Sequence, residues 1–115
     1  MQFLVTVTIA QHPGSPPAEL QTAMTKFVRD ETRAGTFVVT GGLAERADGT
    51  RVGVSKAGQM KSEPRIPIDG YAVVECPAVE QAIEVASRLL RLHQDFVPHW
   101  EVDCEVRQIV TDCLP

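Results

Sequence analysis

The chain has 115 residues, of which 43% are hydrophobic and 23% are charged, and its formal net charge is −4. This length favours a single domain, residues 1–115, that buries an ordinary core without disulfides. The acidic balance and the scattered Lys and Arg argue against nucleic acid or a membrane surface as partners, and no stretch approaches the roughly 20 apolar residues that span a bilayer. Three cysteines without metal-type spacing suit a reducing compartment, so we expect a cytoplasmic protein.

The first third of the chain predicts a strand, a helix and a second strand. Residues 3–9 alternate between two faces, as a half-buried strand does. Ser15 is expected to cap a helix that has two prolines in its first turn and ends at Gly35. Residues 36–40 are β-branched or aromatic and therefore predict the next strand.

The middle of the chain predicts a hairpin followed by a loop and another strand. Gly41-Gly42 is interpreted as a β-bulge. A tight turn at 47–50 is expected to connect the segment 43–46 to a returning strand at 51–54. After a glycine- and charge-bearing segment, residues 71–75 form a compact apolar run that predicts a strand with both faces covered.

The last third predicts a helix and a final strand. Pro77 is placed at the first helical position, and an apolar stripe runs from Val79 to His93. A strand from about residue 99 to 110 would turn Val102, Cys104 and Val106 to one face and acidic residues to the other.

The resulting order, β-α-β-β-β-α-β, predicts an α+β fold on the split β-α-β, or ferredoxin-like, plan with an added hairpin element. Two helices would cover one face of a largely antiparallel sheet. One apolar side chain from each of the pairs 3–4, 38–39 and 73–74 would remain on the other face, and a second subunit can cover it. We therefore expect a homodimer in which two sheets pack face to face as a dimeric α/β-barrel.

Several short segments resemble the YCII-related domain family, in the branch named for its DGPF motif. The segments that carry the resemblance are Arg33-Ala34-Gly35, Gly41-Gly42-Leu43, Gly70-Tyr71, the helix over 79–92 with His93, and Glu105-Val106-Arg107-Gln108-Ile109. The resemblance implies a dimeric α/β-barrel with a cleft. It also implies a suspected His–Asp site, and a few relatives in the wider family are lyases or dehydrochlorinases that act on aromatic ring compounds.

The motif that names this branch is degenerate in the present chain. Its place is taken by Ala57-Gly58-Gln59-Met60, in which only Gly58 matches and Ala57 replaces the acidic residue. Glu63 corresponds to the acidic position that follows. By resemblance, the segment from Gly58 to Arg65 borders the cleft, and the replaced acid favours either ligand binding or a different arrangement of the site.

Three residues are candidates for proton transfer. His93 lies near a helix C-terminus, where it is either a general base or anion-binding group or a structural histidine hydrogen-bonded at the helix end. His12 follows the first strand and either lines a pocket or only forms a turn. Asp69 either approaches a histidine across the sheet or caps the start of the next strand.

Other residues are candidates for ligand binding. Arg65 can neutralise a carboxylate or phenolate, Tyr71 can orient a hydroxyl or simply pack, and Glu63 is placed beside them by the resemblance. The acidic row at 101–105 can hold a cation, but a solvated strand face is favoured. Cys76, at the expected N-cap of the second helix, is more readily interpreted as a packed thiol than as a redox group.

Two functional hypotheses follow. The first is a cofactor-independent protein, without a metal, that binds a small-molecule ligand in a cleft and, if it is an enzyme, performs lyase- or isomerase-type proton transfer with a histidine base. The alternative is a non-catalytic regulatory or protein-interaction module. An enzyme needs a base and a partner acid within hydrogen-bond reach, whereas a binding module does not.

Overall fold

The computed structural model describes residues 1–10, 14–45, 48–63 and 68–110, apart from the side chain of Glu63. Within these ranges it has eight elements, namely β1 (Gln2–Ile9), α1 (Ala18–Arg33), β2 (Phe37–Gly42), β3 (Arg51–Val54), β4 (Met60–Glu63), β5 (Gly70–Glu75), α2 (Val79–Phe96) and β6 (Val102–Gln108). Neither helix in these ranges combines the length and the apolar character that crossing a membrane requires.

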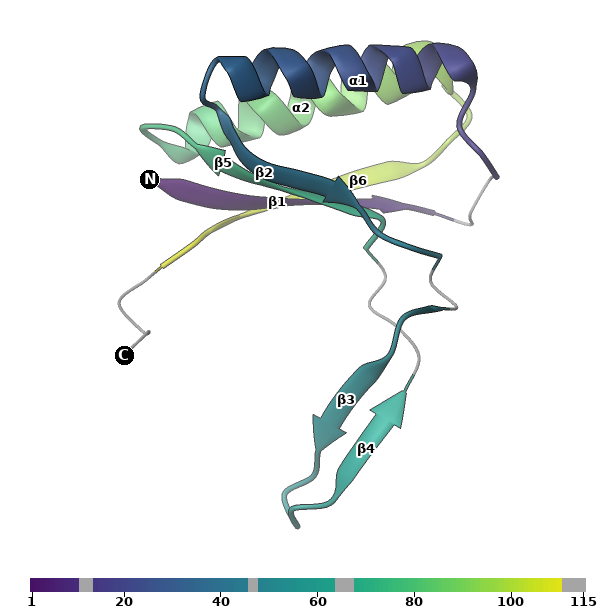
Figure 1. Ribbon diagram of the computed structural model, residues 1–115, viewed down its shortest axis with the longest axis vertical. Coiled ribbons are helices and arrows are strands. Elements are labelled where there is room, and N and C mark those ends of the chain that lie inside the picture. The colour runs from purple at the N-terminus through teal and green to yellow at the C-terminus, as the bar shows by residue number, and fades with distance from the viewer. Residues whose placement is uncertain (11–13, 46–47, 64–67, 111–115) are drawn as a thin grey trace.

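The main sheet has four strands in the order β2-β5-β1-β6, and every neighbouring pair is antiparallel. The two helices lie together on one face of this sheet (Figure 1). Each helix follows one strand of the sheet and returns the chain to another, which is the split β-α-β arrangement. The predicted α+β class is confirmed, and the strand order is compatible with the ferredoxin-like plan.

The core lies between the helices and the central strands. The alternation predicted for β1 directs Phe3 and Val5 toward the helices, and their exposed fractions are 1% and 4%. Phe3 pairs in register with Val74, which is fully buried. The stripe predicted on α2 supplies the opposite wall, since Ala82 and Ala86 belong to the same buried cluster. Burial of these side chains from water is the main force that holds the layers together.

A polar contact connects the two helices. The buried Glu31 carboxylate of α1 accepts a hydrogen bond of 2.6 Å from the Arg88 guanidinium of α2. The same guanidinium lies 5.5 Å from the centre of the Phe27 ring, which packs edge-on against Phe37 of β2. Arg88 therefore joins an ion pair to a cation–π contact at the point where α1, α2 and β2 meet.

Three predicted boundaries were wrong by a few residues. The first helix begins at Ala18 after Pro17, whose extended backbone (ψ 154°) forms the N-cap, so Ser15 does not cap it. The second helix begins at Val79 and is capped by Ala78, so Pro77 precedes it. The last strand covers only Val102–Gln108, although its predicted alternation between half-buried and exposed residues is correct.

The predicted hairpin was also wrong. Residues 43–45 form no strand, and β3 instead pairs forward with β4, a strand that the sequence analysis treated as loop. The Gly58 N–H donates to the Ser55 carbonyl in the connecting turn, and φ of Gly58 is +82°, a conformation that glycine adopts readily. The irregular register in β2 lies between Phe37 and Val39 rather than at Gly41-Gly42.

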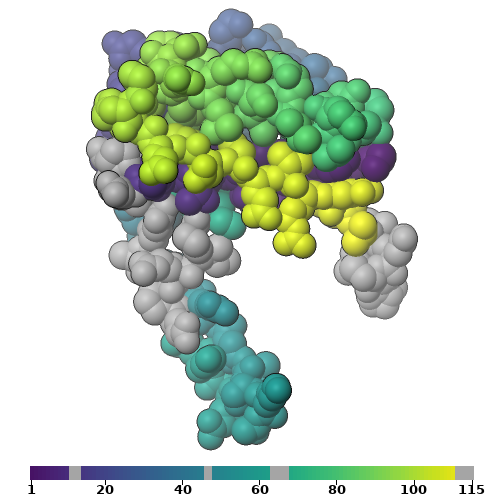
Figure 2. Space-filling view, turned by 180° about the vertical axis from the view of Figure 1, so that it is seen from behind, coloured from purple at the N-terminus to yellow at the C-terminus, as the bar shows by residue number. Residues whose placement is uncertain are grey.

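The face of the main sheet opposite the helices is uncovered within the described chain. The side chains on this face include Leu4, Thr6 and Val73 of the central strands, which are half-buried, and Val39 of β2, which is 47% exposed. The β3–β4 hairpin stands off on this side of the sheet and away from the helices (Figures 1 and 2). We call residues 51–62 the arm and the rest of the described chain the body.

Candidate functional site

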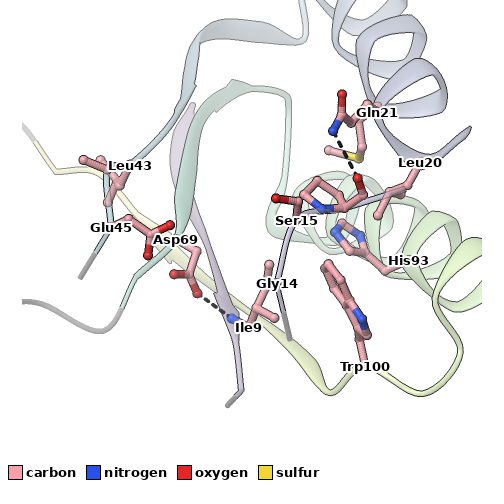
Figure 3. A pocket seen from close by; sticks show the side chains of 13 residues that line it. Ile9, Gly14, Ser15, Leu20, Gln21, Leu43, Glu45, Asp69, His93 and Trp100 are labelled. Carbon is pink, nitrogen blue, oxygen red and sulfur yellow. Dashed lines mark hydrogen bonds between the residues drawn. The ribbon is translucent and has the colours of Figure 1, made fainter. Parts of the chain in front are cut away.

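Two adjoining cavities, each of about 430 Å³, lie between the helices and the sheet. Four residues border both cavities, namely Ile9, Met24, Asp69 and His93. The outer cavity lies between the segment before α1, the residues after β2 and Trp100 (Figure 3). The inner cavity extends toward core side chains such as Val5 and Leu89. A volume of this order suits a small organic ligand.

His93 is held in one orientation by its own helix. It lies in the last turn of α2, it is buried, and its Nδ1 is 2.9 Å from the Leu89 carbonyl oxygen one turn earlier. A carbonyl oxygen can only accept a hydrogen bond, so Nδ1 carries the proton in this contact. In the neutral imidazole the other ring nitrogen, Nε2, is then the acceptor.

His93 borders both cavities, and the accessibility of its Nε2 atom follows from its hydrogen bonds. Among the residues that the structure describes, no partner hydrogen-bonds to this atom. Nor does that part of the chain contain a fully buried side-chain nitrogen or oxygen without a hydrogen bond. It follows that Nε2 has accessible surface, and the cavities that His93 borders provide it. The site therefore presents a hydrogen-bond acceptor to whatever occupies it.

Asp69 is positioned by backbone groups at the ends of strands β1 and β2. Its Oδ2 accepts a hydrogen bond of 2.6 Å from the Ile9 N–H, its own N–H donates to the Val7 carbonyl, and its carbonyl accepts from the Leu43 N–H. These contacts hold the carboxylate at the shared boundary of the cavities. Figure 3 shows Asp69 and Glu45 across the outer cavity from His93 and Trp100. Within the described chain Asp69 does not hydrogen-bond to His93.

The remaining walls are mainly apolar. Leu20 and Trp100 line the outer cavity, and Phe37, Ala72 and Val85 line the inner one. Trp100 is brought beside the end of α2 by a turn in which its N–H donates to the carbonyl of buried Val97. A ligand with an apolar body and few polar groups fits such walls best.

The other predicted site residues have different places. His12 and Arg65 lie outside the described residues, as does the side chain of Glu63, whose backbone ends β4. Tyr71 borders the inner cavity, but the alternation of β5 turns its ring to the uncovered sheet face, where it covers Gly41. Gly58 lies in the turn between β3 and β4 and lines neither cavity.

The cysteines and the acidic row are not part of the cavities. The buried Cys76 thiol donates to the Ala78 carbonyl, so the prediction of a packed thiol is confirmed, whereas its placement as the N-cap was wrong. Burial, with a smaller contribution from neighbouring Asp103, raises the pKa of the Cys104 thiol to about 11. The acidic residues of the row are exposed, and the described residues include no group of three side chains placed to hold a metal ion.

The sequence analysis did not identify Trp100 or Met24 as cavity residues. Trp100 falls within the last strand predicted over about residues 99–110, and Met24 falls within the predicted first helix. Both border the outer cavity because the turn after α2 and the N-terminal half of α1 converge on His93. The sequence shows a lone tryptophan directly before a strand, but that pattern alone does not predict a cavity residue. Trp100 reaches the cavity only because α2 packs beside that strand.

Comparison with known proteins adds no assignment, since no family model and no curated protein matches this chain.

Proposed function

We propose that this protein binds a small molecule, with an apolar body and one hydroxyl or N–H donor, in the two cavities around His93. The observation that carries the proposal is the hydrogen bond between Nδ1 and the Leu89 carbonyl, which makes Nε2 an acceptor facing the cavities. The ligand's donor would bind to Nε2, and its apolar part would lie against Trp100 or extend toward Phe37.

The same geometry supports proton transfer without a cofactor. In that step Nε2 takes a proton from an O–H or C–H bond of the ligand, and the electron pair of that bond stays on the ligand. Return of the proton to another atom completes an isomerisation, and loss of a leaving group completes a lyase reaction.

The resemblance to YCII-related domains belongs to this proposal, including the pairing of His93 with Asp69. The dimeric α/β-barrel belongs to it as well. It is supported by the uncovered sheet face, where Val39 is 47% exposed and Leu4 and Val73 are only half-buried. A second sheet packed on this face would remove these side chains from water.

One observation favours the alternative of a non-catalytic binding module. The Asp69 carboxylate is engaged by the Ile9 N–H and does not hydrogen-bond to His93 in the described chain. A base without a partner acid binds a donor as well as a catalytic base does, but it is less suited to completing a reaction. Binding and catalysis are therefore tested separately.

Binding is tested by thermal shift with a panel of phenols, small carboxylates and neutral alcohols of matched size. We expect the phenols and alcohols to raise the melting temperature of the wild type in a concentration-dependent way and to have little effect on His93→Gln. His99→Gln is the control, because His99 is exposed in the turn after α2. Equal shifts in the wild type and in His93→Gln would contradict the proposal.

Catalysis is tested with any compound that binds, by following deuterium incorporation from D₂O into its C–H positions by NMR. Incorporation with the wild type and not with His93→Gln would establish His93 as the base. Binding with neither deuterium incorporation nor conversion of the compound would establish the non-catalytic module.

A further inference from the structure

The arm carries an apolar face that nothing in the described chain covers. Val52, Val54 and Met60 are 65%, 63% and 70% exposed. They share one face of the hairpin, because Val54 pairs in register with Met60 and Val52 is two residues away on the same strand. A two-stranded hairpin is marginally stable in water by itself, so this face requires a partner.

The accessible area indicates how large that partner surface is. The chain exposes 8033 Å², whereas a compact monomer of 12.6 kDa exposes roughly 6,200 Å². The excess of about 1,800 Å² per chain falls within the roughly 1,000–2,500 Å² that one subunit of an obligate homodimer buries. The radius of gyration agrees, since it is 16.1 Å against roughly 13 Å for a compact domain of about this size.

The charge distribution indicates what kind of surface it is. The β3–β4 hairpin over residues 51–63 carries three positive charges and one negative charge, a net +2. The remainder of the chain therefore carries a net −6. Exposed Asp103 and Glu105 are part of that negative charge, and the alternation of β6 places both on the uncovered sheet face. The arm is thus complementary in charge to the body of its own sequence, although it stands clear of the body in its own chain (Figure 2).

We propose that the arm packs against a second copy of this chain in a homodimer. Each arm extends across the two-fold axis of the dimer. Its apolar residues Val52, Val54 and Met60 contact the body of the other copy. Its basic residues lie near the acidic edge strand β6 of that copy. Such an exchange is reciprocal, so both arms are covered at once. It extends the proposed sheet-to-sheet dimer on which it rests, because the arm stands on the side of the uncovered face.

The contact is tested by photo-crosslinking the purified chain with benzoylphenylalanine in place of Val54. The control carries the same group in place of Ile83, which is 50% exposed on α2. The account predicts a species of about 25 kDa, twice 12.6 kDa, on a denaturing gel for position 54 and not for position 83. Crosslinks confined to one chain would show that the arm folds onto its own body, and they would overturn the proposal.

The contribution of the arm contact to dimer stability is tested by analytical ultracentrifugation, which measures the dimer dissociation constant. The double variant Val52→Asp/Val54→Asp is compared with the control Ile83→Asp. We expect the double variant to raise the dimer dissociation constant about 100-fold or more, because two carboxylates would be buried in an apolar contact. Ile83→Asp should change it less than about 3-fold. Unchanged Trp100 fluorescence would show that the body of each variant remains folded.

The outcomes separate this proposal from the one before it. A dimeric wild type whose double variant also stays dimeric overturns the arm contact and leaves the barrel dimer standing. A monomeric wild type overturns both and assigns the arm to a different protein. Ligand shifts that depend on His93 are measured independently, so the proposed binding site stands or falls by its own result.

Discussion

The body and the arm use the same kinds of side chain in opposite ways. In the body, Val74 is fully buried and Phe3 is 1% exposed, because the helices cover the sheet on which they lie. In the arm, Val52 and Val54 are more than 60% exposed, and the hairpin makes no layer with any other element (Figure 1). The body thus buries its own core and holds the candidate site, whereas the apolar side chains of the arm find no partner among the residues that the structure describes.

The largest expected effect is a difference in unfolding free energy between a substitution in the body and one in the arm. Phe3→Ala should lower the free energy of unfolding by about 4 kcal/mol, because it leaves a cavity in the core. Gly58→Ala strains the arm turn at φ +82° but should change the unfolding of the body by less than about 0.5 kcal/mol. Urea denaturation followed by Trp100, the only tryptophan, measures both variants. Comparable losses would contradict the division into body and arm.

A smaller effect tests what joins the helices of the body. Arg88→Ala should destabilise the protein by about 2 kcal/mol, since it leaves the Glu31 carboxylate buried without its partner. The partial exposure of Arg88 keeps this loss below that of a fully buried pair. Arg91→Ala is the matched control, because Arg91 and Glu84 are both exposed and 3.7 Å apart. A loss for Arg91→Ala as large as that for Arg88→Ala in the same denaturation experiment would show that burial of Glu31 is not the cause.

The smallest expected effect is a pH dependence of stability, which tests whether water reaches the helix-covered face of the sheet at edge strand β6. The pKa of Cys104 rises from 9.0 to about 11 in the folded chain, so the unfolded chain loses this proton first as the pH rises. Stability should therefore fall between pH 9 and 11, and the wild type should lose about 1 kcal/mol more than Cys104→Ala between pH 7.5 and pH 10. Denaturation under reducing conditions measures this difference. Equal losses would mean that water reaches the thiol.

The sequence predicted the elements whose patterns are local. The alternation in β1 and β6 and the stripe on α2 were sufficient, because each is set by the burial of one face. The strand β4 was missed, since Met60-Lys61-Ser62-Glu63 has no β-branched residue and becomes a strand only through pairing with β3. The helix starts were misplaced because Pro16 and Pro77 were assigned to the helices that they precede.

The candidate site was predictable only in part. His93 and Asp69 were both named, and both border the two cavities. Their separate hydrogen bonds, to Leu89 and to Ile9, could not be predicted, because they depend on how α2 and the end of β1 are placed in space. The same holds for Trp100, which reaches the cavity through a turn whose direction no local pattern specifies.

The tautomer of His93 is the most direct test of the account, because the proposed function depends on Nε2 as an acceptor. Nitrogen-15 NMR of the imidazole rings, with His93→Gln to assign the signals, distinguishes a protonated from an unprotonated ring nitrogen. We predict that at neutral pH the neutral ring carries its proton on Nδ1, and that a ligand found in the thermal-shift panel changes the Nε2 signal. A proton on Nε2 in the free protein, or an Nε2 signal that no bound ligand alters, would contradict the account.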